Sequence, residues 1–190
     1  MTAPRAVQPR PAVFLDRDGT INLDTHYVRR PEDVQLIPGA AEAIARLNAA
    51  GIPVIVVSNQ SGIGRGLMTR AEYDAVSARI DELLALSGAR IDATYICPHA
   101  PSPDGGAALC DCRKPGTLLF RTAATEHSID LSRSTFIGDR WRDISPALEL
   151  GARGILVPSS DTPSDDLRRA RVELAVTDTL EAAVADVLRG

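Results

Sequence analysis

The sequence has no long apolar run and no excess of basic residues. No stretch approaches the length that a membrane-spanning helix requires, and no hydrophobic segment near the N-terminus could serve as a secretion signal. The formal net charge of -4 argues against nucleic acid as the main partner, because contacts with a phosphate backbone require clustered Lys and Arg. We therefore expect a cytoplasmic protein that binds neither membranes nor nucleic acid.

Internal repeats and dividing linkers are also missing from the sequence. A chain of 190 residues that is 44% hydrophobic and 24% charged suits one globular domain with a full core. Residues 1–10 are rich in proline and arginine, so we expect a disordered leader there. Residues 11–190 are then expected to form a single domain, and the protein is expected to be a monomer.

Short apolar stretches alternate with segments of helical periodicity, a pattern typical of a doubly wound, parallel α/β sheet. Predicted strands cover residues 12–15, 53–57, 93–96, 134–137, 154–157 and 174–176. Predicted helices cover residues 40–50, a segment opened by a capping box at 69–72, residues 117–126 and residues 143–151. Residues 158–170, with two Asp-rich turns, suggest no chemistry.

Two aspartates stand at the end of the first predicted strand. Asp16 and Asp18 follow an apolar stretch and precede Gly19, at the strand end where open α/β folds bind ligands. Carboxylates held so close together repel each other unless a cation or a shared proton is present. Asp16 could attack phosphorus as a nucleophile, and Asp18 could act as general acid and base. The alternative is a strand-end Asp that caps its own turn, followed by an ordinary Asp-Gly turn.

Further polar groups follow predicted strands or precede predicted helices. Ser58 could bind phosphoryl oxygens together with loop N–H groups, and a plain Ser/Asn turn is the alternative. Lys114 could supply positive charge, although a lone Lys is usually a solvated surface group. Asp139 and Asp143 bring carboxylates to the same sheet edge, where one of them can ligate Mg²⁺ beside Asp16. Asp143 could instead cap its helix.

Cysteine is scarce, and all three cysteines lie close together with one histidine. Their odd number argues against a disulfide framework. The cluster has the ligand set of a closed structural Zn²⁺ site, namely Cys97, His99, Cys110 and Cys112. The alternative is scattered buried thiols and a surface histidine. Four protein ligands leave no open position, so zinc would hold loop 97–112 and fix Arg113 and Lys114, which follow it.

With these motifs in view, the chain resembles the D,D-heptose 1,7-bisphosphate 7-phosphatases, a zinc-loop, histidinol-phosphatase-like subgroup of the haloacid dehalogenase superfamily. The resemblance covers about residues 11–157 and is carried by the segments FLDRDGTIN, SNQSGIGRG, CPH, CDCRKP and the Gly138-Asp139 pair. It implies a Rossmann-like α/β hydrolase without a large cap domain. It further implies Mg²⁺-dependent removal of the 7-phosphate of D-glycero-D-manno-heptose 1,7-bisphosphate, a small phosphorylated sugar, through an aspartyl-phosphate.

The resemblance also assigns roles to single residues. It implies Asp16 as nucleophile, Asp18 as general acid and base, and Ser58 and Lys114 as groups that stabilise the phosphoryl group. Mg²⁺ would be bound by Asp16, the backbone carbonyl of Asp18, and Asp139. The implied substrate-binding residues are Asp24, Thr25, His26, Tyr27, Asn59, Gln60, Ser61, Arg113 and Arg140. Ser58 stands where the family usually has Thr, and Arg140 where it usually has Lys.

Three other functions are compatible with parts of this pattern. Histidinol-phosphate phosphatases, or phosphatases for another small sugar phosphate, share the zinc loop, although their metal-ligand pairs generally lie closer in sequence. A phospho-acceptor signalling domain also phosphorylates an Asp at a sheet edge, but the second carboxylate, Asp18, favours turnover over a long-lived phosphorylated state. A zinc-stapled binding module would have no use for the intact catalytic set.

Overall fold

The computed structural model describes residues 8–25, 27–102 and 110–190. Part of the predicted leader, His26 and part of loop 97–112 therefore lie outside the described residues. Within the predicted leader, the N–H of Arg10 donates to the carbonyl of Ser128 at 3.0 Å, and its carbonyl accepts from the N–H of Asp130 at 2.9 Å. Arg10 is thus already part of the fold.

The described residues build a parallel sheet, which confirms the predicted fold class. Its strands are β1 Val13–Leu15, β2 Val54–Asn59, β3 Ala93–Cys97, β4 Thr135–Gly138, β5 Arg153–Leu156 and β6 Ala175–Val176. They lie in the order β3-β2-β1-β4-β5-β6, and every neighbouring pair is parallel. Each predicted strand is present, with its ends no more than two residues from the predicted ones. Since β1 pairs with both β2 and β4, its carboxyl end lies at the switch point of the strand order.

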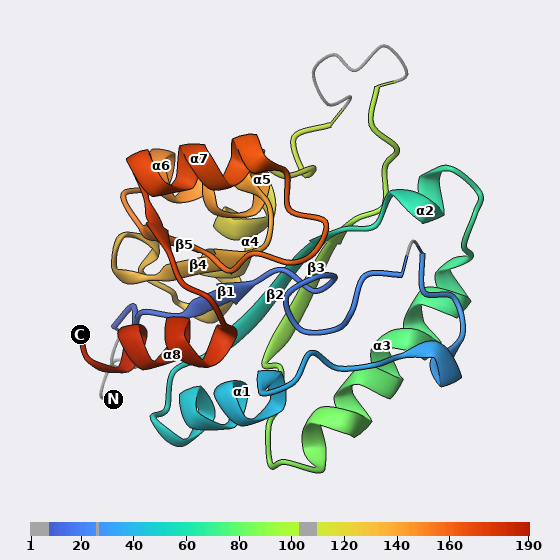
Figure 1. Cartoon of the computed structure of the whole chain (residues 1–190), viewed down its shortest axis with the longest axis horizontal. Helices are drawn as coiled ribbons and strands as arrows, with labels where there is room; N and C mark the ends of the chain where they lie inside the picture. Colours follow the sequence, from blue (N-terminus) through green and yellow to red (C-terminus); the bar gives the residue numbers. More distant parts are fainter. Residues whose placement is uncertain (1–7, 26, 103–109) are drawn as a thin grey trace, which may run out of the picture.

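Helices cover both faces of the sheet (Figure 1). They are α1 Ala40–Ala49, α2 Ser61–Gly64, α3 Arg70–Ala85, α4 Leu118–His127, α5 Trp141–Ile144, α6 Pro146–Leu150, α7 Ser164–Glu173 and α8 Leu180–Leu188, with 3-10 turns at Pro31–Asp33 and Leu131–Arg133. Figure 1 shows α1, α3 and α8 on one side of the sheet and α4 to α7 on the other. None of the helices within the described residues is long and apolar enough to cross a membrane.

Alternation along the central strands divides the core between these two layers. Val13 and Leu15 pack in the cluster that includes α1, α3 and α8, whereas Phe14 points to the opposite face. There its ring stacks on Phe136 at 4.9 Å between centroids and meets Phe120 of α4 edge-on at 5.4 Å. Aromatic pairs in these geometries stabilise a core beyond their buried area. Packing on both faces therefore fixes β1, the strand that leads into the Asp16–Asp18 pair.

The structure corrects the predicted helices in two places. The helix predicted over residues 143–151 is divided into α5 and α6, because Pro146 has no N–H to continue the hydrogen-bond ladder and starts a new helix instead. Residues 158–170, where the sequence predicts two Asp-rich turns and no helix, include most of α7, whose first turn contains Asp165 and Asp166. Acidic residues favour the first turn of a helix, where they interact with the helix dipole.

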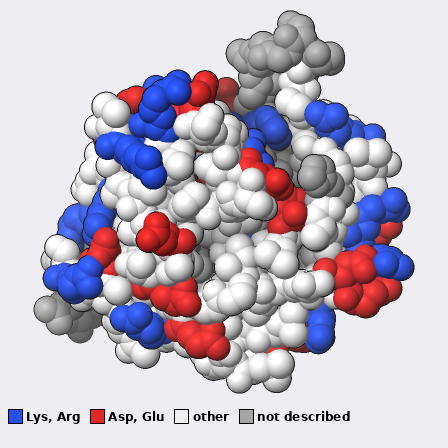
Figure 2. Space-filling model, in the orientation of Figure 1, with Lys and Arg blue, Asp and Glu red and all other residues white. Residues whose placement is uncertain are grey.

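One face of the molecule carries charged side chains of both signs (Figure 2). On the face shown in Figure 2, Lys and Arg side chains occur in small groups interspersed with Asp and Glu.

Candidate active site

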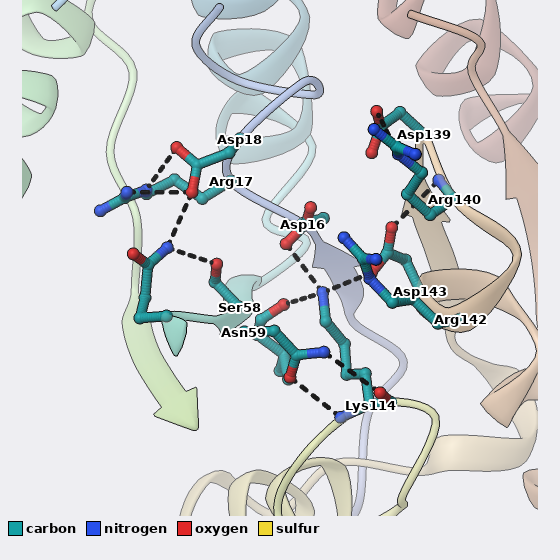
Figure 3. A network of polar contacts seen from close by, with 12 residues as sticks. Asp16, Arg17, Asp18, Ser58, Asn59, Lys114, Asp139, Arg140, Arg142 and Asp143 are labelled. Atoms are coloured by element: carbon teal, nitrogen blue, oxygen red, sulfur yellow. Dashed lines mark hydrogen bonds and ion pairs between the residues drawn. The ribbon is translucent and has the colours of Figure 1, made fainter. Parts of the chain in front are cut away.

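The carboxyl ends of β1, β2 and β4 bring the predicted site residues to one edge of the sheet. Asp16 follows β1, Ser58 lies at the end of β2, and Asp139 follows β4. These strands are neighbours, so residues far apart in sequence surround one cavity of about 280 Å³. Figure 3 shows Asp16 at the centre of the polar network, with Asp18 on one side and Asp139 and Asp143 on the other.

Lys114 joins the predicted nucleophile to a second carboxylate. Its Nζ lies 2.7 Å from Asp16 Oδ1, 2.8 Å from Asp143 Oδ1 and 2.6 Å from the carbonyl oxygen of Val57. The side chains of all three charged residues are buried. Burial opposes the charge of Lys114, but the carboxylates of Asp143 and Asp16 outweigh it and raise the pKa of Lys114. Its ammonium group is therefore charged at neutral pH and faces the site where a phosphoryl group would be transferred.

Three buried carboxylates form a cluster that suits a hard cation. Asp16, Asp139 and Asp143 each offer an oxygen within 4.8 Å of the others. Burial, and then the charge of Asp143, raises the pKa of Asp16 to about 7 even though Lys114 lowers it. The same two causes raise the pKa of Asp139 to about 6. Three carboxylates beside one ammonium leave excess negative charge, which a divalent cation with a preference for oxygen ligands would neutralise.

Asp143 is the least available of the three carboxylates for a cation. Its Oδ1 contacts Lys114, and its Oδ2 accepts a hydrogen bond from the N–H of Arg140 at 3.0 Å. The second contact is the helix cap that the sequence offered as an alternative role for Asp143, and both roles occur together. Asp16 and Asp139 are therefore the residues best placed to hold a metal ion.

Asp18 is turned away from Asp16 toward Arg17 (Figure 3). Nε and Nη2 of Arg17 donate to its two oxygens at 3.1 and 2.9 Å, and the side-chain amides of Asn22 and Gln60 donate at 3.0 and 2.7 Å. Burial alone would raise the pKa of Asp18, but the charge and hydrogen bonds of Arg17, with those of Asn22 and Gln60, lower it. In this arrangement Asp18 is an ionised carboxylate, the form required of a general base.

Most of the predicted substrate-binding residues line the cavity, and some of them also form hydrogen bonds within the protein. Asp24, Tyr27, Asn59, Gln60, Ser61, Arg113 and Arg140 all line the cavity. Thr25 is exposed and does not line it, and His26 lies outside the described residues. The Gln60 amide donates to Ser58 as well as to Asp18. The Asn59 side chain exchanges hydrogen bonds of 3.1 and 3.0 Å with the backbone of Lys114.

The predicted zinc ligands converge on one point. Cys112 Sγ lies 3.2 Å from both Cys97 Sγ and His99 Nδ1 and 3.3 Å from Cys110 Sγ. All four ligand atoms lie within 4.8 Å of one another, and the three cysteines are not joined in disulfides. Three sulfurs and one imidazole nitrogen at these separations fit the coordination shell of a tetrahedral zinc ion.

The cysteine cluster is tied to the site at several points. The N–H of Gln60 donates to the carbonyl of Cys97 at 2.7 Å, and the N–H of Gly64 donates to the carbonyl of Pro98 at 2.8 Å. A Cβ on Gly64 would lie 2.6 Å from that carbonyl oxygen, so only glycine permits this approach. Arg113 Nη1 donates to the carbonyl of His99 at 3.3 Å. The cluster is therefore linked directly to Arg113, and to Lys114 through the chain, since both residues follow loop 97–112.

Several residues of the site escaped the sequence analysis. Arg17 is buried, and its guanidinium lies 4.9 Å from the ring centre of Tyr73. Arg142 lines the cavity. Ser159, in a segment to which no chemistry was assigned, donates to Asp139. A signal for Ser159 was present, because it follows a predicted strand just as Asp16, Ser58 and Asp139 do.

Family models match both parts of the chain. A model of haloacid dehalogenase-like hydrolases matches residues 13–84, and a model of HAD-hydrolase-like proteins matches residues 111–183. Together they include the Asp16–Asp18 segment, Ser58, Lys114 and Asp139.

Relatives with assigned activities extend this similarity. The chain is 48% identical over 155 residues to a D-glycero-D-manno-heptose-1,7-bisphosphate 7-phosphatase of Thermosynechococcus vestitus, covering 78% of this chain and 79% of that protein. It is 42% identical over 139 residues to the D-glycero-beta-D-manno-heptose-1,7-bisphosphate 7-phosphatase of Photorhabdus laumondii, covering 72% and 74%. The crystal structure of a B. bronchiseptica D,D-heptose 1,7-bisphosphate phosphatase with magnesium and phosphate superposes with a TM-score of 0.84 at 32% identity, covering 94% of this chain and 98% of that one.

Proposed function

Since the chain belongs to the D-glycero-D-manno-heptose-1,7-bisphosphate 7-phosphatases of the haloacid dehalogenase-like hydrolases, we propose that it removes the 7-phosphate of that sugar through an aspartyl-phosphate on Asp16. The observation that carries this proposal is the contact of 2.7 Å between buried Asp16 and Lys114. It keeps a carboxylate and a positive charge together at the switch point of the sheet. That combination suits nucleophilic attack on a phosphate ester.

In the first half of the reaction, an oxygen of Asp16 forms a bond to phosphorus while the bond between phosphorus and the sugar oxygen breaks. The departing alkoxide takes a proton from Asp18. Because Asp18 is ionised in the free protein, it must gain that proton from the phosphate monoester or from water when the substrate binds. Lys114, buried against Asp16, stabilises the negative charge of the phosphoryl oxygens. Ser58 and nearby backbone N–H groups complete this role from the end of β2.

In the second half, Asp18 takes a proton from a water molecule, and the water oxygen attacks phosphorus. The bond between phosphorus and Asp16 breaks, and inorganic phosphate leaves. The hydrogen bonds that Arg17 and Gln60 donate to Asp18 favour its ionised form and so suit this step.

Two metals fit this scheme. Mg²⁺ on Asp16, Asp139 and the backbone carbonyl of Asp18 would supply positive charge to the phosphoryl group. Zn²⁺ on Cys97, His99, Cys110 and Cys112 would have four protein ligands and would act structurally. The magnesium in the B. bronchiseptica relative supports the first assignment.

A comparison of kcat/KM between substrates tests the proposed activity directly. With Mg²⁺ present, we expect kcat/KM for D-glycero-D-manno-heptose 1,7-bisphosphate to exceed that for histidinol phosphate by at least ~10²-fold, because a site built for charged groups rejects a substrate that leaves them unpaired. Released phosphate is measured for both substrates and for a panel of sugar monophosphates. Equal or higher kcat/KM for histidinol phosphate would assign the chain to that activity instead, and a stable phosphoenzyme without turnover would indicate a signalling domain.

Replacing Asp18 tests whether it is the general acid and base while Asp16 is the nucleophile. We expect Asp18→Asn to lower kcat for the sugar phosphate by ~10²- to 10⁴-fold, because no acid protonates the alkoxide. With p-nitrophenyl phosphate, whose leaving group needs no proton, we expect about one equivalent of nitrophenol per chain, followed by a stall. Mass spectrometry of the stalled enzyme should show one added phosphoryl group. Steady turnover of p-nitrophenyl phosphate at the wild-type rate would contradict the role of Asp18 as the base in the second half.

A further inference from the structure

A turn that includes Ser159 and Thr162 follows β5 and forms hydrogen bonds with Asp139. Ser159 Oγ donates to Asp139 Oδ2 at 2.7 Å, and Thr162 Oγ1 donates to the backbone carbonyl of Asp139 at 2.7 Å. The turn is itself anchored to β4, because the N–H of Val157 donates to the carbonyl of Gly138 at 3.0 Å. Both the side chain and the backbone of Asp139 are therefore fixed by one short segment.

The hydroxyl protons of this turn have defined directions. Ser159 Oγ accepts from the N–H of Asp161 at 3.2 Å, and Thr162 Oγ1 accepts from the N–H of Ser159 at 2.8 Å. Since a carboxylate oxygen and a backbone carbonyl can only accept, the Ser159 and Thr162 hydroxyls donate their protons to Asp139. A bond donated to a carboxylate is charge-assisted and stronger than one between neutral groups.

These contacts distinguish the two oxygens of the Asp139 carboxylate. Oδ2 receives the Ser159 hydroxyl and lies 3.4 Å from Nε of Arg140. Oδ2 also faces the bare Cα of Gly19, where a Cβ would come within 2.5 Å of it, and Gly19 has a φ of +82°. The hydrogen bond and the ion pair that the structure describes for this carboxylate thus both fall on Oδ2, and Oδ1 is the oxygen left for a cation shared with Asp16.

We propose that Ser159 is a positioning residue for the cation site: it holds Asp139 Oδ2 so that Oδ1 is presented to the divalent cation beside Asp16. Metal-ligating carboxylates are commonly held by such hydrogen bonds, and losing one costs metal affinity. The proposal rests on the proposed function only in requiring a Mg²⁺ site at Asp16 and Asp139. It does not depend on the identity of the substrate.

Mg²⁺ affinity of the full chain tests this role. We expect Ser159→Ala to weaken Mg²⁺ binding, measured by isothermal titration calorimetry without substrate, by ~10- to 100-fold. The Mg²⁺ concentration that gives half-maximal phosphatase activity should rise by the same factor. At saturating Mg²⁺, kcat should return to within about threefold of wild type, because the bound cation itself then holds Oδ1. A merely structural role for Ser159 would lower kcat at every Mg²⁺ concentration.

Ser160 provides a matched control, because it is the next hydroxyl of the same turn and is exposed. Ser160→Ala should leave Mg²⁺ affinity unchanged, and Ser159→Thr, which keeps a hydroxyl, should stay close to wild type. Unchanged affinity in Ser159→Ala, or an equal loss in Ser160→Ala, would overturn the proposal. Failure of heptose bisphosphate hydrolysis with normal Mg²⁺ binding would instead count against the substrate assignment alone. Absence of Mg²⁺ binding by the wild-type chain would remove both the cation site and the role of Ser159.

Discussion

Asp16→Asn is expected to abolish turnover, with a loss in kcat of at least ~10⁴-fold, as is usual when the nucleophile of a covalent mechanism is removed. An amide oxygen keeps its lone pairs but carries no negative charge, so it is a far weaker nucleophile toward phosphorus than a carboxylate. The loss should extend to p-nitrophenyl phosphate, because that substrate relieves only the need for an acid. No phosphoenzyme should form with any substrate, and this separates Asp16→Asn from Asp18→Asn.

The same substitution should not weaken the metal-free fold. Burial and the neighbouring Asp143 raise the pKa of Asp16 from 3.8 to about 7, so between these values the folded chain keeps a proton that the unfolded chain releases. Stability of the metal-free protein therefore falls as pH rises through this window and stays low above it. Asn carries no charge and can still accept from Lys114. In EDTA at pH 8, its melting temperature should equal or exceed that of wild type.

Mg²⁺ should reverse this order. The cation should stabilise wild type more at pH 8 than at pH 5.5, because it competes with protons for Asp16 and Asp139. It should stabilise Asp16→Asn much less at either pH. Thermal melting with Mg²⁺ or EDTA at both pH values measures these differences, and phosphate release measures activity. Asp74→Asn, the same chemical change on the exposed surface of α3, should match wild type. Substantial turnover by folded Asp16→Asn would exclude the aspartyl-phosphate route.

The sequence alone was sufficient to place the centre of this site. An apolar run ending in Asp16 predicts a buried strand, and parallel strands carry ligand-binding groups at their carboxyl ends. The same rule applies to Ser58 and Asp139. The sequence alone therefore predicts that these three residues lie at one edge of the sheet. The closely spaced cysteines and histidine likewise indicate a shared metal, because their side chains are the preferred ligands of zinc.

The partners of these groups could not be predicted in the same way. Lys114 lies 98 positions from Asp16 in sequence, and Asn59 at the end of β2 binds the backbone of Lys114 beside the site. Such a contact depends on the path of the loop rather than on any periodicity. In sequence, Asp143 looks like an ordinary helix cap, and its Oδ2 does accept from the N–H of Arg140 as a cap would. Only the contact of its Oδ1 with Lys114 shows that it also balances the charge of that lysine.

Two helices near the C-terminus were overlooked for different reasons. α7 is polar on most sides: Ala170 is its one fully buried residue, and Leu167 and Leu174 pack beside it only partly buried, so its apolar period is short and weak. α8 does carry a recognisable signal, since Thr179 caps it and Leu180, Ala183 and Val184 are buried at helical spacing. Because neither helix was predicted, the segment between β5 and α7 was interpreted as an ordinary loop. Ser159 lies in that segment, and its contact with Asp139 was therefore not predicted.

The cysteine cluster is a second group whose loss should inactivate the protein, although it takes no direct part in the reaction at phosphorus. Cys112→Ser is expected to abolish binding of the proposed zinc, because Cys112 Sγ lies within 3.3 Å of each of the other three ligand atoms. Binding of structural zinc is typically worth ~10–16 kcal/mol, and serine is a poor ligand for it. The sheet should still fold, since of the four ligands only Cys97 is buried in it.

Zinc loss should nevertheless remove most of the activity, because Arg113 and Lys114 follow Cys112 directly in the chain. A displacement of about 1 Å in a catalytic group can cost ~10²-fold in rate, so we expect kcat of Cys112→Ser to fall by at least that factor. Zinc content by mass spectrometry and kcat at saturating Mg²⁺ are measured together. His127→Gln, which removes an imidazole on α4 outside the cluster, should keep both. Full activity in zinc-free Cys112→Ser would show that the hydrogen bonds between Asn59 and Lys114 suffice to hold the lysine.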